Sequence, residues 1–455
     1  MLAAGLCIVG FWTSFTLGRR ALWAGFVASI LVGDLYGILR ANIGQPASHF
    51  IFDAALSGLY LAALTQGFPI SRIPKLRPLV PWVVILVVWP ILLVAVPGQD
   101  SLIRLVGLRG QIFFIPILMI AGSFNGSEMT QIARFTAILN CVALAVALVE
   151  TKLGLSLFYP HNAVDEIIYS SRDVLIGGAA LYRIPSSFTS SAAYAGTMVI
   201  SAPLLLGAMV VEPPKSRWRH VLLCGSVASA IGVFVAASRS AAVFEILMMT
   251  LFIPFARVKG FSVSSWIAIL AGLTLLILVT PRMQRFLTLR DSRFVSNRLG
   301  SSVNTGFIQV VQEYPFGNGL GGGGSSIPYF LQTRVKNEMS IENEYGLILL
   351  EQGVPGLMMW LAFIFWLMTR PLPSRSDPWY TGKWLARAFC ALSFATAPLG
   401  NGMLSAIPQT AMLMLYAGWI AMPRDTPSVS DCRRYARHGS AKSSITHLLD
   451  STSRA

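Results

Sequence analysis

The sequence predicts an all-α fold, a polytopic helical bundle that crosses a membrane about twelve or thirteen times. Of the 455 residues, 54% are hydrophobic and only 12% are charged, whereas a soluble globular domain carries about 25% charged residues. The mean hydropathy is +0.63. The apolar residues also gather into blocks long enough to cross about 30 Å of hydrocarbon at 1.5 Å per helical residue. These observations exclude an ordinary soluble protein.

Each apolar block is expected to form one membrane-spanning helix. The blocks lie at residues 1–17, 21–38, 50–68, 79–97, 110–123, 133–150, 187–210, 220–237, 240–256, 262–280, 345–369, 384–399 and 407–422. No basic region precedes the first block and no small-x-small cleavage site follows it, so we interpret it as a span rather than a signal peptide. Residues 1–424 are predicted to form the transmembrane domain. Residues 425–455, rich in Ser, Arg and Thr without an apolar period, are predicted to form a disordered basic cytoplasmic tail.

The basic residues lie mainly between the blocks and predict the orientation of the chain. The net charge is +15, from 35 Lys and Arg against 20 Asp and Glu. Short loops rich in Lys and Arg stay in the cytoplasm, and such loops alternate along the chain, from Arg19 and Arg20 to the tail. The alternation places two long loops, 151–186 and 281–344, on the outside. We expect membrane lipids or a phosphate-bearing substrate as partners, and no nucleic acid.

The second long loop is rich in arginine although the alternation places it outside. Loops of this length translocate largely regardless of charge, and long loops in compact proteins are usually functional. A solvated surface loop is one interpretation. The other is an anion-binding site, with short helices within the loop.

Two arginines lie at the outer ends of spans. Arg183 precedes Pro185, and because Pro favours an extended residue before it, we expect the next helix to begin after Pro185 with a Ser or Thr cap. Arg183 would then lie at a helix N-terminus, which favours anions. An arginine that snorkels to the membrane interface is the alternative. Arg239 lies in Ala-Ala-Ser-Arg-Ser-Ala-Ala, a junction with almost no loop to hydrate it, and a charge embedded there usually marks function.

The end of the second long loop combines glycines with carboxylates. No Gly-Lys-Ser/Thr follows the glycine-rich stretch at 317–324, so we interpret it as a flexible elbow that lines a cavity, and not as a nucleotide site. Glu342 lies at the mouth of the next span, where a general base would be wanted. Glu344 and Glu351 share a helical face. A cap or a hydrated helix end is the alternative for each glutamate.

Histidines and cysteines give no sign of a metal site. The five histidines and five cysteines are scattered, with no HxxxH, HExxH or CxxC spacing. We therefore expect neither a bound metal nor a disulfide framework.

Taken together, these segments resemble the O-antigen ligase and polymerase superfamily. The matching stretches run from Arg183 to Phe188, Ser238 to Ala241, Ser292 to Gly321 and Glu342 to Leu357, and with the spans between them they cover roughly residues 130–422. The resemblance implies a multi-pass glycosyltransferase of the bacterial inner membrane, with its long loop in the periplasm and its C-terminus in the cytoplasm. Such enzymes transfer a polyprenyl-diphosphate-linked saccharide to an acceptor hydroxyl by an inverting displacement that needs no metal or cofactor.

The resemblance also implies roles for individual residues. Arg183 and Arg239 would bind the diphosphate leaving group, with help from Arg293. Arginine suits this role because its planar guanidinium binds phosphate through two hydrogen bonds. Asn343 and Tyr345 would contact sugar.

One position departs from the pattern of the family's ligases. They carry a histidine where this chain has Glu342, and a carboxylate can still deprotonate a hydroxyl as its bond to carbon forms. We therefore predict a polymerase of exopolysaccharide or O-antigen type, with Glu342 as its catalytic base and with chain-length regulators and export proteins as possible partners.

A ligase that acts on a lipid or protein acceptor is an alternative. A transporter or flippase for the same glycan is another, although transporters commonly show duplicated halves and ionisable residues near the midplane, and the clear candidates here are Asp34, Asp53 and Glu245.

Overall fold

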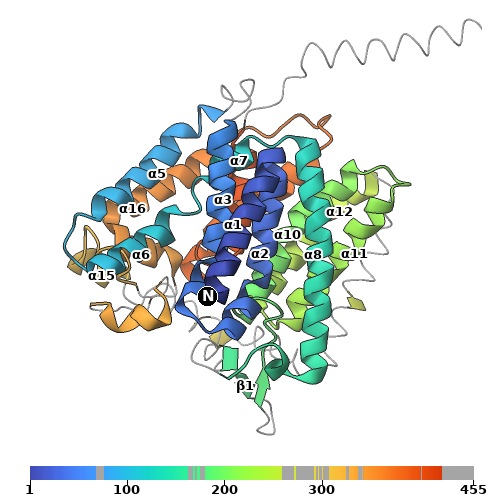
Figure 1. The fold of residues 1–455 in the computed structure, drawn as a ribbon. Helices are drawn as coiled ribbons and strands as arrows, with labels where there is room; N and C mark the ends of the chain where they lie inside the picture. The colour runs from blue at the N-terminus through green and yellow to red at the C-terminus, as the bar shows by residue number, and fades with distance from the viewer. Residues whose placement is uncertain are drawn as a thin grey trace, which may run out of the picture.

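The protein is almost entirely helical in its described part, and most helices lie side by side as one bundle (Figure 1). The structure is a computed structural model that describes residues 1–67, 76–161, 168–169, 172–174, 180–258, 271–272, 292–293, 296, 300, 307–323, 327–336, 341, 343–400 and 402–422. The α-helices are α1 (Leu2–Arg20), α2 (Leu22–Ile43), α3 (Ile51–Gln66), α5 (Val80–Leu93), α6 (Ser101–Ile112), α7 (Ile117–Gly122), α8 (Gly126–Leu153), α10 (Ser191–Val211), α11 (Arg217–Val235), α12 (Arg239–Val258), α15 (Phe307–Glu313), α16 (Glu344–Met368), α17 (Tyr380–Thr396) and α18 (Gln409–Ala421).

Short elements connect the helices. Four are 3-10 turns: η1 (Pro46–Phe50), η2 (Leu155–Leu157), η4 (Tyr329–Arg334) and η5 (Ala397–Leu399). Two three-residue strands, β1 (Arg172–Val174) and β2 (Ala180–Tyr182), pair antiparallel with Arg172 opposite Tyr182. They lie at one end of the bundle, beyond the end of α8 (Figure 1).

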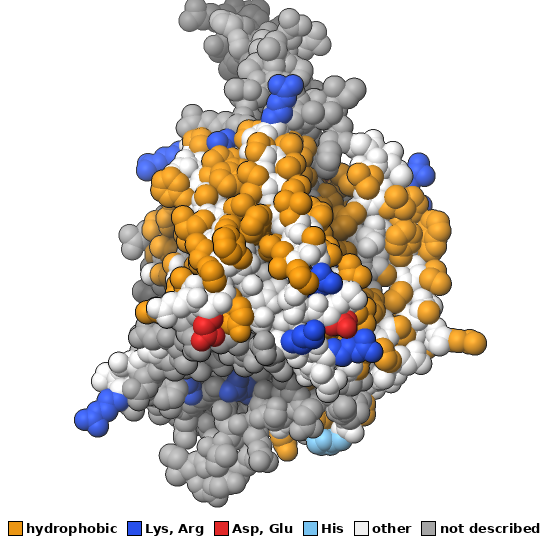
Figure 2. Space-filling model, turned by 90° about the vertical axis from the view of Figure 1, so that its left-hand side faces the viewer, with side chains coloured by type: hydrophobic (Ala, Val, Ile, Leu, Met, Phe, Trp, Pro, Cys, Tyr) orange, Lys and Arg blue, Asp and Glu red, His pale blue; other side chains and the backbone are white. Residues whose placement is uncertain are grey.

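The bundle has the surface of a membrane protein. Eight helical segments of the described chain are long and apolar enough to cross a membrane: Leu2–Arg20, Leu22–Ile43, Pro46–Gln66, Ser101–Gly122, Gly126–Leu153, Ser191–Val211, Arg217–Val235 and Glu344–Met368. Figure 2 shows hydrophobic side chains over the middle of one face, with charged side chains toward its two rims. The predicted polytopic helical membrane bundle is therefore confirmed.

Twelve of the thirteen predicted apolar blocks coincide with helices. The block at 110–123 corresponds to the end of α6 together with α7, which are separated by a short interruption before Ile117. The block at 262–280 lies outside the described residues except for 271–272, and the predicted tail at 425–455 lies entirely outside them.

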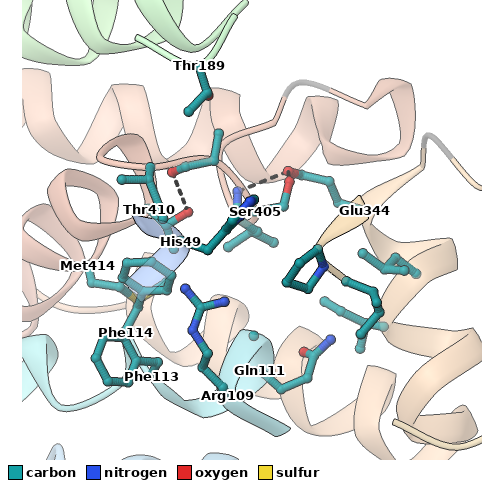
Figure 3. A pocket seen from close by; sticks show the side chains of 18 of the residues that line it. His49, Arg109, Gln111, Phe113, Phe114, Thr189, Glu344, Ser405, Thr410 and Met414 are labelled. Atoms are coloured by element: carbon teal, nitrogen blue, oxygen red, sulfur yellow. Dashed lines mark hydrogen bonds between the residues drawn. The ribbon is translucent and has the colours of Figure 1, made fainter. Parts of the chain in front are cut away.

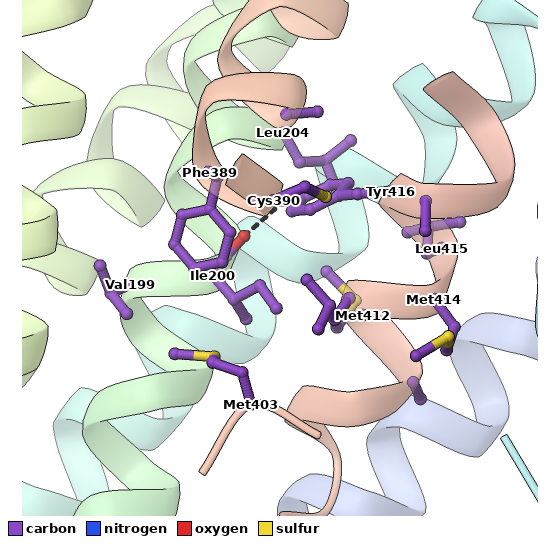
Figure 4. Close-up of a cluster of buried hydrophobic side chains, with 14 of the residues drawn as sticks. Val199, Ile200, Leu204, Phe389, Cys390, Met403, Met412, Met414, Leu415 and Tyr416 are labelled. Carbon is purple, nitrogen blue, oxygen red and sulfur yellow. Dashed lines mark hydrogen bonds between the residues drawn. The ribbon is translucent and has the colours of Figure 1, made fainter. Parts of the chain in front are cut away.

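Helices α10 and α18 form the centre of the bundle. Every residue of α18 is buried, as are all but three of the twenty-one residues of α10; a helix that is apolar all round belongs in a core. Figure 4 shows their contact, where Tyr416 of α18 donates a hydrogen bond to the carbonyl of Ile200 in α10 beside Phe389 of α17. The segments that enter these helices are consequently held by the core, and both border the cavity described below.

Helix α16 is broken within its apolar stretch, where the sequence predicts one continuous span. Gly353 has φ 72° and ψ −178°, a conformation essentially restricted to glycine. Two backbone groups freed by the break find partners in the glycine-rich turn: Val354 N–H donates to Pro315 O at 2.9 Å, and Asn318 N–H donates to Leu350 O at 2.6 Å. Irregular backbone is tolerated at membrane depth when it is buried in protein in this way. The glycine-rich turn is thus fixed against α16.

Candidate functional site

A cavity of about 700 Å³ lies at one end of the bundle. Its lining comes from helices far apart in sequence, including α2, α6, α16 and α18 with the segments that lead into α10 and α18. Figure 3 shows polar side chains from these elements around the same space. We therefore treat this cavity as the candidate site.

One wall of the cavity carries the cationic side chains Arg40, from the last turn of α2, and Arg109, from α6. Arg109 forms a two-pronged ion pair with Asp53 of α3, in which Nε and Nη2 each donate to a carboxylate oxygen at 2.7 Å. The pair fixes the guanidinium plane and leaves Nη1 without a hydrogen bond to the described residues. The Arg40 guanidinium carbon lies 5.8 Å from the centre of the Tyr36 ring, within the range of a cation–π contact.

An imidazole lies on the same wall. His49 belongs to η1, the turn that leads into α3, and is 9% exposed. Its backbone carbonyl accepts a hydrogen bond from Tyr36 Oη at 3.1 Å, which ties η1 to α2. The basic groups on this wall thus come from three elements held together by hydrogen bonds and the Asp53 ion pair.

The opposite wall carries a buried carboxylate, Glu344, at the start of α16. Its Oε1 accepts hydrogen bonds from Leu404 N–H at 2.9 Å and from Ser405 Oγ at 3.3 Å. Its Oε2 has no hydrogen-bond partner among the described residues, although Glu344 is only 5% exposed. Burying a carboxylate oxygen without a partner is costly, so this orientation is one that a ligand hydroxyl would stabilise. Figure 3 shows Glu344 across the cavity from Arg109.

The third part of the lining is the segment that enters α10. Ser190 caps this helix by accepting a hydrogen bond from Ala193 N–H, which confirms the predicted Ser or Thr cap after Pro185. Thr189 and Ser190 both line the cavity. Residues 184–188 before them are buried, so the backbone of the segment is held in place.

Contacts at Ser186 and Phe188 explain how this segment is held. Ser186 has a positive φ of 53°, and its N–H donates to Glu150 Oε2 of α8 at 2.8 Å. Tyr159 Oη lies 2.6 Å from Ser186 O and 2.7 Å from Phe188 O. On the other side Gly37 of α2 approaches so closely that a Cβ there would lie 2.1 Å from the Phe188 carbonyl carbon. The cavity wall therefore depends on close packing between α2, α8 and this segment.

The structure places Arg183 and Arg239 at the same end of the bundle. Helices α10 and α11 are joined by a short turn at 212–216 and run antiparallel, with Gly232 near the end of α11 against Tyr194 near the start of α10. Arg239 opens α12 after three intervening residues, so it lies at the level where α10 begins; both arginines are partly buried. Neither of them lines the cavity. Arg183 precedes the Ser190 cap by seven residues, so it lies further from the helix N-terminus than predicted.

The other predicted residues lie as follows. Asn343 is the N-cap of α16 and its Oδ1 accepts a hydrogen bond from Gly346 N–H at 3.0 Å, while Tyr345 Oη donates to Phe394 O at 2.6 Å. Neither residue lines the cavity. Their contacts give both of them a structural role at the start of α16. Arg293 is exposed and also lies outside the lining. Glu342 lies outside the described residues.

Sequence reasoning singled out Glu344 but missed the cationic residues that line the cavity. Arg40 follows one apolar block and Arg109 directly precedes another, so neither belongs to a recognisable motif. The available signal was Asp53, an ionisable residue inside an apolar block, because such a residue is expected to have a buried partner. That partner is Arg109, 56 residues away.

Comparisons with known proteins give no further assignment. No protein-family model matches the chain, and no curated protein matches it. Among the described residues, no group of three or more His, Cys, Asp or Glu side chains could hold a metal ion.

Proposed function

We propose that the protein is a membrane glycosyltransferase that polymerises polyprenyl-diphosphate-linked repeat units of a surface polysaccharide. The observation that carries the proposal is the cavity itself, because guanidinium groups lie on one wall and a partly unpaired carboxylate lies on the other. A transfer of this kind requires that pairing, since an anion leaves on one side of the sugar while a hydroxyl loses its proton on the other.

The cationic wall fits the leaving group. In an inverting displacement the bond between the anomeric carbon and the diphosphate oxygen breaks, and the diphosphate leaves with the bonding electrons. Arg40 and Nη1 of Arg109 are held before any ligand arrives, and such preorganised charges stabilise a developing anion more strongly in a dehydrated cavity than in water. The role of Arg183, Arg239 and Arg293 as further diphosphate ligands stays a prediction, because none of the three lines the cavity. Arg183 and Arg239 do lie at the cavity's end of the bundle.

The carboxylate wall fits the acceptor. The attacking hydroxyl oxygen forms the new bond to the anomeric carbon and gives its proton to a base. The sequence predicts Glu342 for this task, and Glu344, two residues further on, is the described carboxylate that reaches the cavity. Asn343 would then act by holding the start of α16, and Tyr345 by anchoring it to α17.

The charges at the two ends of the bundle support an outward-facing cavity. The end opposite the cavity carries the short basic connections around Arg20, Arg217 and Arg375, and short basic loops stay in the cytoplasm. On this basis the cavity faces the periplasm of a bacterial inner membrane. Lipid-linked repeat units and the growing chain would meet there.

A transporter for the same lipid-linked glycan is the second candidate. The break in α16 at Gly353 favours it, because substrate sites of transporters are typically formed by discontinuous helices. Against it, the break is closed by the glycine-rich turn through Pro315 and Asn318.

Saccharides that accumulate in a deletion strain test the proposal. Loss of a polymerase leaves single repeat units on the lipid at the outer leaflet, loss of a ligase leaves long chains on the lipid, and loss of a flippase leaves single units at the inner leaflet. We expect the first result. Complementation with Arg40→Ala should fail to restore polymer, whereas Arg20→Ala should restore it, because Arg20 ends α1 at the other end of the bundle. Normal polymer in the deletion strain would refute the proposal.

A further inference from the structure

The carboxamide of Gln111 is held in a single orientation at the cavity wall. Gln111 lies in α6 and lines the cavity. Its Nε2 donates to Glu351 Oε2 at 2.7 Å, and its Oε1 accepts from Gln352 Nε2 at 2.7 Å. Both partners are in α16, 240 residues or more away along the chain, and none of these bonds is needed to form either helix.

Glu351 determines which way this amide points. The nitrogen of Gln111 faces the Glu351 carboxylate and its oxygen faces Gln352 Nε2, and a carboxylate oxygen is a natural acceptor for an amide N–H. Glu351 is fully buried and Gln352 is 2% exposed; the backbone carbonyl of Gln352 accepts a hydrogen bond from Trp89 Nε1 at 3.1 Å. Because a buried carboxylate is costly unless it is hydrogen-bonded, the network resists a flip of the Gln111 amide.

The amide of Gln111 keeps unused hydrogen-bonding capacity. Its nitrogen carries two N–H groups and its oxygen two lone pairs, and one of each is used by the contacts to Glu351 and Gln352 among the described residues. One donor and one acceptor thus remain, side by side, on a side chain that lines the cavity. A sugar ring presents the matching pattern, because each hydroxyl is both a donor and an acceptor.

We propose that Gln111 forms a subsite for the hydroxyl groups of a neutral sugar ring, with Glu351 as the residue that positions it. The inference rests on the proposed function for the source of the sugar, the saccharide of the lipid-linked substrate. It adds a recognition element separate from the arginines, which bind the diphosphate, and from Glu344. A site built to pair with a hydroxyl discriminates strongly against a sugar that lacks it, because its own polar groups would be left unpaired.

Binding and transfer are measured separately to test this subsite. The probe is the oligosaccharide released by mild acid from the organism's own lipid-linked donor, titrated into the purified full-length protein in nanodiscs. Trp360 lines the cavity, so a fluorescence change that is absent in Trp360→Phe reports occupancy. Gln111→Ala should weaken oligosaccharide binding roughly three- to tenfold, the effect of one or two neutral hydrogen bonds. The matched control is Gln312→Ala on α15, which is exposed and outside the cavity and should leave binding unchanged.

A double-mutant cycle tests the role of Glu351. Glu351→Gln should weaken oligosaccharide binding in the wild-type background and have no further effect in Gln111→Ala, because neither Glu351 nor its backbone contacts at Gly321 and Gly323 line the cavity, so its effect on the sugar passes through that amide. Gln352→Met, which removes only the donor to Gln111 Oε1, gives the same test by a second route if Glu351→Gln does not fold.

In the transfer assay both single variants should raise KM for the donor and leave kcat within twofold. Unchanged binding in Gln111→Ala, or additive effects in both cycles, would overturn the subsite. Oligosaccharide binding with no transfer by the wild type would overturn the proposed function and keep the subsite.

Discussion

Replacing Gly37 by alanine tests whether the wall of the cavity depends on the contact between α2 and residues 184–190. The new Cβ would lie 2.1 Å from the carbonyl carbon of Phe188 and 2.2 Å from its oxygen, and ordinary contact begins at 3.4 Å. The two backbones must therefore separate by about 1.3 Å, the difference between these distances. Both partners are backbone, so no side-chain rotation can relieve the clash.

The expected cost is large enough to measure. Overpacking costs about 1–3 kcal/mol, and a clash between two backbones belongs at the upper end of that range. Gly5→Ala is the control, because Gly5 also lies within a helix and a Cβ there would meet nothing within 4 Å. Both substitutions bring the same gain in helix propensity, about 1 kcal/mol, so the difference between the variants isolates the clash.

Thermal unfolding and donor binding provide the two readouts. Gly37→Ala should unfold roughly 6–12 °C below Gly5→Ala, since the cost is about 3 kcal/mol and 1 kcal/mol shifts the Tm of a sizeable domain by about 2–4 °C. It should also bind the donor more weakly, because the displaced segment carries Thr189 and Ser190 of the lining. If the two variants had the same Tm and the same donor affinity, the close approach of α2 would not be what shapes the cavity.

Three further predictions concern the transfer reaction and the break in α16. Glu344→Gln should lower kcat at least tenfold with little change in donor KM if this carboxylate takes the proton; a loss confined to Glu342→Gln would assign the base to the earlier residue. Arg239→Ala should raise donor KM and abolish polymer formation in cells without lowering protein abundance on an immunoblot, and unchanged polymer length and yield would remove Arg239 from the mechanism. Gly353→Ala should reduce the yield of folded protein in size-exclusion chromatography, because its φ of 72° disfavours alanine and a Cβ would lie 2.5 Å from the carbonyl carbon of Phe316. A normal yield would show that the break in α16 is not held by the glycine-rich turn.

Local sequence was sufficient to predict most of the helices. Membrane helices need long apolar stretches, and hydropathy alone detects these. A Ser or Thr cap after Pro185 also follows from local rules, and the cap is Ser190, although Ser186, Ser187 and Thr189 satisfy the same rule. The turn between α11 and α12 is also predictable from local sequence, since Arg239 and the serines on either side of it lie between two apolar blocks.

The cavity was not predictable, because it depends on pairs of residues that are distant in sequence. Asp53 and Arg109 are 56 residues apart, and neither position indicates the other without the fold. The same holds for Gln111 and Glu351, 240 residues apart. The break in α16 was missed because Gly353 is favourable only when the glycine-rich turn supplies its hydrogen bonds.

The most direct test of the account is transfer by the purified protein in vesicles. The substrate is the organism's own polyprenyl-diphosphate-linked repeat unit, supplied to the side that the cavity faces. The proposal predicts a ladder of lipid-linked chains that grow by one repeat unit, with one free polyprenyl diphosphate released for each new bond, and neither product in Arg40→Ala. Repeat units that cross the bilayer unchanged, with no ladder and no released diphosphate, would contradict it.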